Sequence, residues 1–379
     1  MEKVLLKIDH LKQYFPLKKQ LGKEQLFVRA NDDISLEIFE GETLGLVGES
    51  GCGKSTLGRT LLQLYTQTEG QTLYSGRNLY DIVPKYLEKT IKNLEGERQK
   101  ALDAQAKYAD VLRDYEQSSD EQKTQKHKEL AECKKDSHMK VHRIAQIIGG
   151  FYTEKNITPL GNLLAEKCKI AKKRHGINEK TEKIHAEKNV INAKRTSAIN
   201  KIEKKLAMLE AEKESCTKAI QKIDKDICEL KNGIAKTDEF EKYEAMLTDS
   251  IDLARLEYKE VRYLRSDIQL IFQDPYSSLN PRMTVGQIIG EGLIAHHMFK
   301  ADDPAMQDYI MKVMDNCGLA PYMFHRYPHQ FSGGQRQRIG IARSLALKPK
   351  FVVCDEAVSA LDVSIQSQVI NLLQDLKEK

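Results

Sequence analysis

The stretch that decides the fold is Gly48-Glu-Ser-Gly-Cys-Gly-Lys-Ser-Thr56, which follows the apolar run Glu42–Val47. It matches the pattern GxxxxGK[ST] in full. The glycines let the backbone curl so that its N–H groups face inward, and the helix expected after Gly53 presents the positive end of its dipole to an anion. A strand that ends in this loop and leads into a helix predicts a binding site for the phosphates of a nucleotide.

Two side chains of this loop have distinct expected roles. Lys54 would neutralise charge on the β- and γ-phosphates, and the Ser55 hydroxyl would bind Mg²⁺. The other positions expected to contact the nucleotide are Gly48, Ser50, Gly51, Cys52, Gly53 and Thr56. By itself the loop predicts only that a nucleoside triphosphate is bound.

Two acidic residues follow a second apolar run. Phe351–Cys354 is largely apolar, and Asp355 and Glu356 come directly after it. This order is typical of a buried parallel strand that delivers carboxylates at its C-terminal edge. We expect Asp355 to hold Mg²⁺ through water and Glu356 to polarise the attacking water. An isolated acidic pair could equally be a solvated strand end, and the phosphate loop upstream favours the catalytic role.

A third motif opens an expected helix that runs through Ile339 to Leu347. Its residues are Ser332, Gly333, Gly334 and Gln335. Exposed N–H groups at a helix start form an anion site. One nucleotide needs only one such cradle, so the second site is explained if it faces a nucleotide held by another subunit.

With these motifs the chain resembles the ATP-binding subunits of ABC transporters. Ser332–Gln335 resembles the family's signature motif, Gln273 in Ile-Phe-Gln-Asp-Pro resembles the Q-loop, and Ser359–Asp362 resembles the D-loop. Tyr14 lies at the position of the family's adenine-stacking aromatic residue, where a ring would stack on the base. An ordinary tyrosine at a strand edge is the alternative for Tyr14.

Two longer stretches narrow the resemblance to the oligopeptide and dipeptide permease branch. They are FQDPYSSLNPRMTV, which begins at Phe272, and YPHQFSGGQRQR, which begins at Tyr327. The resemblance covers residues 1–84 and 263–379, about half of the chain.

The resemblance implies an α/β fold of the P-loop ABC type that binds and hydrolyses ATP with Mg²⁺ to power the import of oligopeptides or dipeptides. It implies Gln273 and Glu356 as catalytic residues, and Ser55, Gln273 and Asp355 as the groups around the metal. The implied partners are a second ABC ATPase subunit, permease subunits that dock on the helical region of roughly Val285–Tyr327, and, indirectly, an extracytoplasmic peptide-binding protein. No nucleic acid is expected, and the chain would lie at the cytoplasmic face of the membrane.

The middle of the chain differs from its flanks in charge. Residues 85–262 hold 38 of the 60 basic and 32 of the 55 acidic residues. Because the two signs are closely mixed, a solvated helical face is favoured over a nucleic-acid patch. We therefore divide the chain into an N-terminal part of the ATPase core (1–84), a helical insertion (85–262), and a C-terminal part with the Q-loop, helical subdomain, signature and acidic pair (263–379).

Apolar residues spaced alternately by four and three predict coiled-coil helices within the insertion. The stronger pattern comprises Ile202, Leu206, Leu209, Cys216, Ile220, Ile223, Ile227, Leu230 and Ile234, and a weaker one comprises Leu87, Ile91, Leu94, Ala101, Tyr108, Leu112 and Tyr115. A less regular stretch with Gly149, Gly150, Pro159 and Gly161 separates them. We expect these two helices to fold back on each other as an antiparallel hairpin, with dimerisation between chains as the alternative.

Three features depart from the family pattern. Ala357 stands where the family usually has proline after the catalytic glutamate, and the insertion lengthens the usual gap between Lys54 and Gln273. No histidine follows His329, although the family places a switch histidine on the strand after the helix that here ends at Lys379. We therefore expect a C-terminally truncated core that binds ATP but hydrolyses it very slowly when alone.

Two other functional classes stay open. ATPases of chromosome maintenance or DNA repair also insert a coiled coil into an ABC-type head, but their coil leaves after the Q-loop, whereas here it precedes Gln273. The other class is a nucleotide-binding module without turnover, which affinity for nucleotide without hydrolysis would favour.

Composition fits a chain that stays in the cytosol. There is no run of about 18 apolar residues and no charged-then-apolar leader, so we expect neither a membrane span nor a signal peptide. The seven cysteines include no CxxC pair. This spacing suits a reducing compartment.

Overall fold

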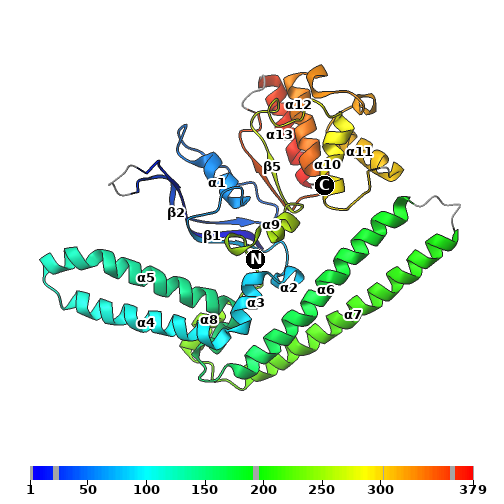
Figure 1. Cartoon of the computed structure of the whole chain (residues 1–379). Helices are drawn as coiled ribbons and strands as arrows, with labels where there is room; N and C mark the ends of the chain where they lie inside the picture. Colours follow the sequence, from blue (N-terminus) through cyan, green and yellow to red (C-terminus); the bar gives the residue numbers. More distant parts are fainter. Residues whose placement is uncertain (1–2, 20–24, 191–195, 302, 359–362, 379) are drawn as a thin grey trace. The chain divides into compact units, whose positions relative to one another are not determined.

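The structure is a computed structural model that describes residues 3–19, 25–190, 196–301, 303–358 and 363–378 (Figure 1). Its contacts divide the chain into two compact units. The first comprises Met1–Arg77, Asn178–Glu210 and Ile251–Lys379, and the second comprises Asn78–Ile177 and Ala211–Ser250. The predicted Q-loop, acidic pair, signature and phosphate loop all lie in the first unit.

The first unit contains an antiparallel sheet of four strands, in the order β2 (Phe27–Phe39), β1 (Val4–Pro16), β3 (Glu69–Tyr74) and β4 (Ile251–Asp252). Apolar residues alternate along β1, where Leu6 and Ile8 are buried. The register then shifts between Ile8 and Leu11, so that Leu11 and Gln13 are buried as well. The sheet thus buries apolar side chains of β1 together with the polar side chain of Gln13.

A parallel pair of strands carries the acidic motif. β5 (Ile268–Ile271) pairs with β6 (Phe351–Cys354) from Ile268 opposite Phe351 to Ile271 opposite Cys354. Parallel neighbours need a long crossover connection. Here the crossover runs through α10 (Val285–Ala295), α11 (Pro304–Asn316), the short helices Pro321–Met323 and Pro328–Gln330, and α12 (Gly333–Leu345); α13 (Val363–Glu378) follows β6.

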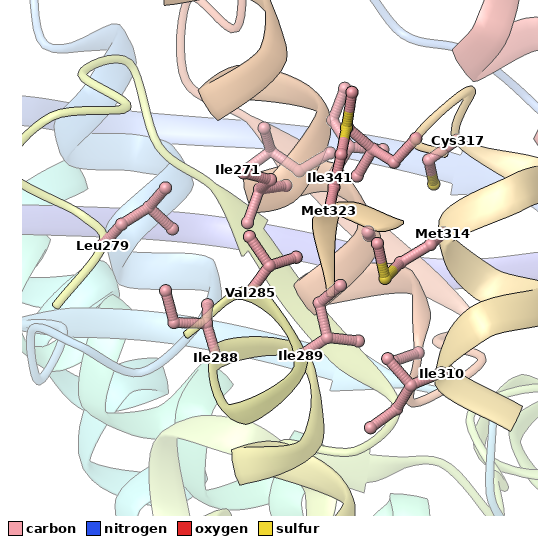
Figure 2. Packing of buried hydrophobic residues seen from close by; sticks show 14 of the residues in the cluster. Ile271, Leu279, Val285, Ile288, Ile289, Ile310, Met314, Cys317, Met323 and Ile341 are labelled. Carbon is pink, nitrogen blue, oxygen red and sulfur yellow. The ribbon is translucent and has the colours of Figure 1, made fainter. Parts of the chain in front are cut away.

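These helices and β5 share one apolar core. Side chains from β5, α10, α11 and α12 contribute to it, among them Ile271, Ile289, Ile310, Met314 and Ile341 (Figure 2). Local sequence fixes the helix starts, because Thr284 and Gln287 cap α10 reciprocally and Asp303 caps α11 just before a proline. The core therefore orients the N-terminus of α12 and the end of β5 together.

The remaining helices of the first unit are α1 (Lys54–Leu61), Leu253–Arg255 and α9 (Tyr258–Leu264). The helices of the second unit are α2 (Leu79–Ile82), α3 (Lys85–Lys92), α4 (Leu94–Glu116), α5 (Asp120–Ile148), Gly149–Thr153 and α8 (Asp238–Glu244). Two long helices, α6 (Thr158–Val190) and α7 (Thr196–Asn232), have residues in both units. None of the helices in the described residues is long and apolar enough to cross a membrane.

The predicted pairing of the long helices is wrong. α4 lies antiparallel to α5, where Lys126 pairs with Asp114 at 2.6 Å, and α6 lies beside α7, where Lys167 pairs with Asp224 at 2.7 Å (Figure 1). Each helix thus packs on its neighbour in the chain. Only residues 117–119 connect α4 to α5, and so short a connection returns the chain directly along the first helix.

The sequence did not reveal α5 because much of it has no apolar seam. No side chain between Asp120 and Asp136 is buried. The stronger heptad pattern lies on α7 except for Ile234, which follows the helix; Leu206, Cys216, Ile220 and Ile223 are buried, whereas Leu230 is exposed. Residues Ile251 and Asp252, inside the predicted insertion 85–262, pair with Tyr74 and Leu73 of β3. The limits of the insertion as a folding unit stay a prediction.

The strand expected just before the phosphate loop is absent. Glu42–Val47 has no strand conformation, and Leu44, Leu46 and Val47 are 42%, 45% and 95% exposed. A strand exists only where a neighbour completes its backbone hydrogen bonds. No strand of the described residues pairs with this run, so its apolar composition alone does not make it one.

A buried ion pair joins the antiparallel sheet to the parallel pair. Asp267 is 5% exposed and receives two hydrogen bonds of 2.5 Å from Arg77 and one of 3.0 Å from the Tyr74 hydroxyl. Burial opposes the charged form of Asp267, but the bonds from Arg77 and Tyr74 hold its pKa below the ordinary value. The carboxylate is therefore ionised in the folded state.

We expect Asp267→Asn to lower the free energy of unfolding by about 3 kcal/mol, because removing one partner of a buried ion pair leaves the other uncompensated. The unfolded pKa of an aspartate is about 3.9. Since the native pKa lies below that value, the contribution of Asp267 is complete above it and is lost as the pH falls through the native pKa. Urea unfolding of both proteins between pH 7 and pH 3 should show the difference narrowing toward acid.

The control for this experiment is Glu37→Gln, which breaks the exposed 2.6 Å pair of Glu37 with Lys7. A surface pair of this kind contributes less than about 1 kcal/mol. Equal losses for the two variants would contradict the role assigned to Asp267.

Candidate functional site

The phosphate loop leads directly into α1. Gly53 precedes the helix with φ +96°, a left-handed conformation that favours glycine, and no side chain caps the helix start. The first N–H groups of a helix have no partner within it. The start of α1 therefore has the geometry of an anion site, and its binding of nucleotide phosphates stays a prediction.

The Lys54 ammonium lies folded over the loop. Its Nζ donates to the carbonyl oxygens of Gly48 at 2.9 Å and Glu49 at 2.7 Å, and it lies 3.7 Å from the Cys52 Sγ. The lysine side chain is long and only partly buried, so it can exchange these carbonyls for phosphate oxygens. The loop thus already concentrates positive charge where the phosphates are expected.

Strand β2 supports the end of the loop through a residue that sequence reasoning missed. The Asn31 side chain is 5% exposed, and its Nδ2 donates to the Gly53 carbonyl at 3.2 Å. A Cβ on Gly53 would lie 2.2 Å from the Ala30 carbonyl oxygen. Asn31 belongs to no motif, and only the approach of β2 to Gly53 reveals its role.

The two catalytic candidates, Gln273 and Glu356, lie together. Each follows its strand by two residues, and the strands are parallel neighbours, so both side chains leave the same edge. Gln273 Nε2 donates to the Glu356 carboxylate at 2.6 Å. Glu356 has φ +47°, a left-handed conformation that is uncommon for a residue with a Cβ. The sharp turn after β6 aims the carboxylate toward the Q-loop.

Asp355 pairs with a residue that no motif singled out. Its carboxylate Oδ2 accepts a 3.2 Å hydrogen bond from the Arg59 Nη2 of α1, and Asp355 is 8% exposed. α1 also packs tightly on β6, because a Cβ on Gly58 would lie 2.9 Å from a methyl of Val353. The helix after the phosphate loop therefore lies against the strand that carries the acids.

The signature residues form the capped start of α12. The Ser332 hydroxyl accepts from the Gln335 N–H at 3.4 Å, and the Gln335 side chain accepts from the Ser332 N–H at 3.2 Å. This capping box is a local pattern that the sequence contains in full. Gly333 and Gly334 fill the first turn of the helix. The D-loop candidate Ser359–Asp362 lies outside the described residues.

Tyr14 is partly buried near the edge of the antiparallel sheet. Its hydroxyl donates to the Asp32 carboxylate, and the Arg29 guanidinium lies 5.6 Å from the ring centroid. Burial and the bond to Asp32 raise the pKa of Tyr14. The ring therefore stays neutral, and stacking on an adenine base remains a prediction.

The oxygen-rich acidic end of β6 fits a magnesium nucleotide. Mg²⁺ prefers carboxylate, hydroxyl and water oxygens, often with phosphates completing the shell. Asp355 is a buried carboxylate that already requires a cationic partner, and Ser55 lies in the first turn of the adjoining helix. Ser55 and Asp355 therefore offer oxygen atoms of the kind that such an ion prefers, and the assignment of Ser55, Gln273 and Asp355 to a metal stays a prediction.

A comparison with protein families identifies the class to which the chain belongs. The model described as ABC transporter matches residues 31–225 and 238–359, well over half of the chain. The chain belongs to the ABC transporter family, with its ATP-binding cassette fold.

Several relatives with names of peptide transport proteins are similar to all or part of the chain. The chain is 29% identical over all 379 residues to the oligopeptide transport ATP-binding protein OppF of Bacillus subtilis, covering 65% of that protein. Over 128 residues it is 56% identical to OppF of Salmonella typhimurium, covering 34% of this chain and 38% of that one. Over 135 residues it is 52% identical to the dipeptide transport ATP-binding protein DppF of Lactococcus lactis, covering 35% and 43%. The chain thus spans between 38% and 65% of these relatives' lengths.

We expect Gly53→Ala to weaken Mg-ATP binding at least about tenfold. The added methyl group would make the left-handed backbone conformation of residue 53 unfavourable and would clash with the Ala30 carbonyl oxygen. Backbone strain of this kind typically costs about 1–3 kcal/mol. Titration calorimetry gives the affinity, and circular dichroism checks the fold. Gly340→Ala is the matched control, because nothing lies within 4 Å of its Cβ position. Equal affinity of the two variants would refute the role of Gly53.

Proposed function

We propose that this chain binds ATP with Mg²⁺ and hydrolyses it as the ATP-binding subunit that powers import of oligopeptides or dipeptides. The observation that carries the proposal is the hydrogen bond from Gln273 to Glu356. Next to Glu356, Asp355 pairs with Arg59, and this contact joins the acidic end of β6 to the helix that follows the phosphate loop. The names of the relatives OppF and DppF support the peptide class of cargo.

Binding would proceed by exchange of partners around Lys54. Its ammonium would leave the carbonyls of Gly48 and Glu49 and bond to the β- and γ-phosphates. The first N–H groups of α1 would donate hydrogen bonds to the remaining phosphate oxygens. Bound Mg²⁺, held by Ser55, Asp355 and Gln273, would neutralise negative charge on the phosphates.

Glu356 would position and deprotonate the attacking water. A carboxylate can accept a proton only through an oxygen that faces the water, and one Glu356 oxygen presently accepts from Gln273. Gln273 would release this Glu356 oxygen, which could then accept a proton, and the Gln273 amide oxygen would be one of the groups that hold the metal. Through Gln273, nucleotide binding would thus determine whether Glu356 is free to act as the general base.

The proposed assembly contains a second ATPase subunit. The N-terminus of α12, with Ser332–Gln335, would face the nucleotide held by the partner subunit's phosphate loop. The permease would dock on the helical region of Val285–Tyr327. This region and the turn before it expose the aromatic side chains of Tyr276 and Tyr322, each 64% exposed, and Tyr327 at 41%. Rings of this kind are enriched at protein interfaces. A peptide-binding protein outside the membrane would act through the permease.

Lys54→Ala should abolish measurable Mg-ATP binding while leaving the fold intact, because the side chain contacts only exposed loop atoms and belongs to no core. Equilibrium titration with ATP and Mg²⁺ measures the affinity. Lys7→Ala removes an equal charge from an exposed ion pair and is the control. Unchanged ATP affinity of Lys54→Ala would show that this loop does not bind the nucleotide phosphates.

Glu356→Gln should slow hydrolysis roughly hundredfold or more while changing ATP affinity less than about threefold, because general-base catalysis contributes about 10²–10⁴ in rate. Single-turnover hydrolysis with a partner ATPase subunit present gives the rate. Full hydrolysis by this variant would show that another group activates the water. ATP binding without turnover in the unmodified protein would instead favour a nucleotide-binding module.

A further inference from the structure

The side chain of Arg59 reaches the carboxylate that is expected to hold Mg²⁺. Arg59 lies on α1, five residues after the phosphate-loop lysine, and its Nη2 is 3.2 Å from the Asp355 Oδ2. The Asp355 side chain is 7% exposed, whereas that of Arg59 is 39% exposed. A carboxylate so far from water needs a positive partner. Arg59 supplies that partner and also hydrogen-bonds to the Tyr65 side chain, while 39% of the Arg59 side chain stays exposed.

Helix geometry places Arg59 on the same side of α1 as Ser55. The two residues are four positions apart, and side chains at this spacing are neighbours on a helix surface. Long helical side chains also lean toward the N-terminus of their helix. The face of α1 that offers the Ser55 hydroxyl to a metal is therefore the face from which Arg59 reaches Asp355.

A guanidinium and Mg²⁺ cannot both be close partners of one carboxylate oxygen without repelling each other. Both are cations, and their repulsion is strong where water is largely excluded. Arg59 is partly exposed and long, so it has a route to solvent when Asp355 is taken by another cation. The proposed binding of phosphate by Lys54, whose ammonium is held by loop carbonyls, would be an equivalent exchange.

We propose that Arg59 is an internal placeholder for the metal: it neutralises Asp355 in the nucleotide-free state and is displaced when Mg-ATP binds. This inference rests on the proposed function of the same site. Arg59 thereby sets the Mg²⁺ concentration at which the metal nucleotide is accepted. If the guanidinium holds Asp355 about nine-tenths of the time, the apparent affinity for the metal is reduced tenfold.

The test compares Arg59→Met with the unmodified protein. Methionine keeps most of the apolar stem and removes the charge. ATP binding is titrated at pH 7.5 as a function of Mg²⁺, and Mn²⁺ bound in the presence of ATP is measured directly by electron paramagnetic resonance. We expect Arg59→Met to reach half-saturation at about tenfold lower metal concentration. Its affinity for ATP in the presence of EDTA should change less than about threefold.

Two further variants serve as matched controls. Arg59→Lys keeps a cation on the same helix face and should keep the metal requirement within about threefold of the unmodified protein. Arg113→Met removes an arginine that is 71% exposed in the second unit and should behave as the unmodified protein does. Thermal unfolding reports whether each variant is folded; if Arg59→Met is not, Arg59→Gln takes its place.

An unchanged or increased metal requirement in the folded Arg59→Met or Arg59→Gln protein would overturn the inference while the proposed function stands. Loss of ATP binding in EDTA would likewise overturn it, because Arg59 would then be a nucleotide ligand. Absence of ATP binding in every protein, the unmodified one included, would overturn the proposed function together with the inference.

Discussion

The contact on which the rest of the first unit depends is the buried pair of Asp267 and Arg77. The Asp267 carboxylate accepts hydrogen bonds from Arg77 and from Tyr74, the last residue of β3. The Asp267 backbone carbonyl accepts hydrogen bonds from the N–H groups of Lys350 and Phe351 at 2.8 and 3.0 Å. A single residue therefore ties the antiparallel sheet to the starts of both parallel strands. Because β5 and β6 have only four residues each, fixing their starts also fixes the ends that carry Gln273 and Asp355.

The nucleotide site is electrostatically satisfied from within the chain. The Lys54 ammonium is held by loop carbonyls, Asp355 by Arg59, and one oxygen of Glu356 by Gln273. Each of these groups would acquire a different partner from a magnesium nucleotide. Nucleotide binding would then replace one set of contacts with another, and the free-energy difference between the two sets would determine the affinity. The pairing with Arg59 offsets the cost of burying the Asp355 carboxylate, since an unpaired buried charge is strongly disfavoured.

The long helices of the middle segment show how little a heptad pattern says about pairing. The pattern in Leu206–Ile223 correctly marks buried positions on α7, but it does not identify the helix opposite. The partner is decided by chain connection and by contacts such as Lys167 with Asp224. α5 was not foreseen because its first half has no buried side chain and so no apolar period. α5 packs beside α4, and its buried side chains lie in its second half, from Ser137 to Ile148.

Sequence alone determined the features whose causes lie within a few residues. The phosphate loop requires glycine at Gly53, the capping box joins Ser332 to Gln335, and an apolar run delivers Asp355 and Glu356; each follows from local backbone geometry and short-range hydrogen bonds.

Only the tertiary structure decided the contacts between distant segments. Arg59 meets Asp355 across 296 positions, and Asn31 meets Gly53 across 22. The tertiary structure also shows that Glu42–Val47 has no strand conformation. Such contacts depend on which elements pack together, and a strand exists only if another strand completes its hydrogen bonds; neither condition is encoded in the residues of one segment.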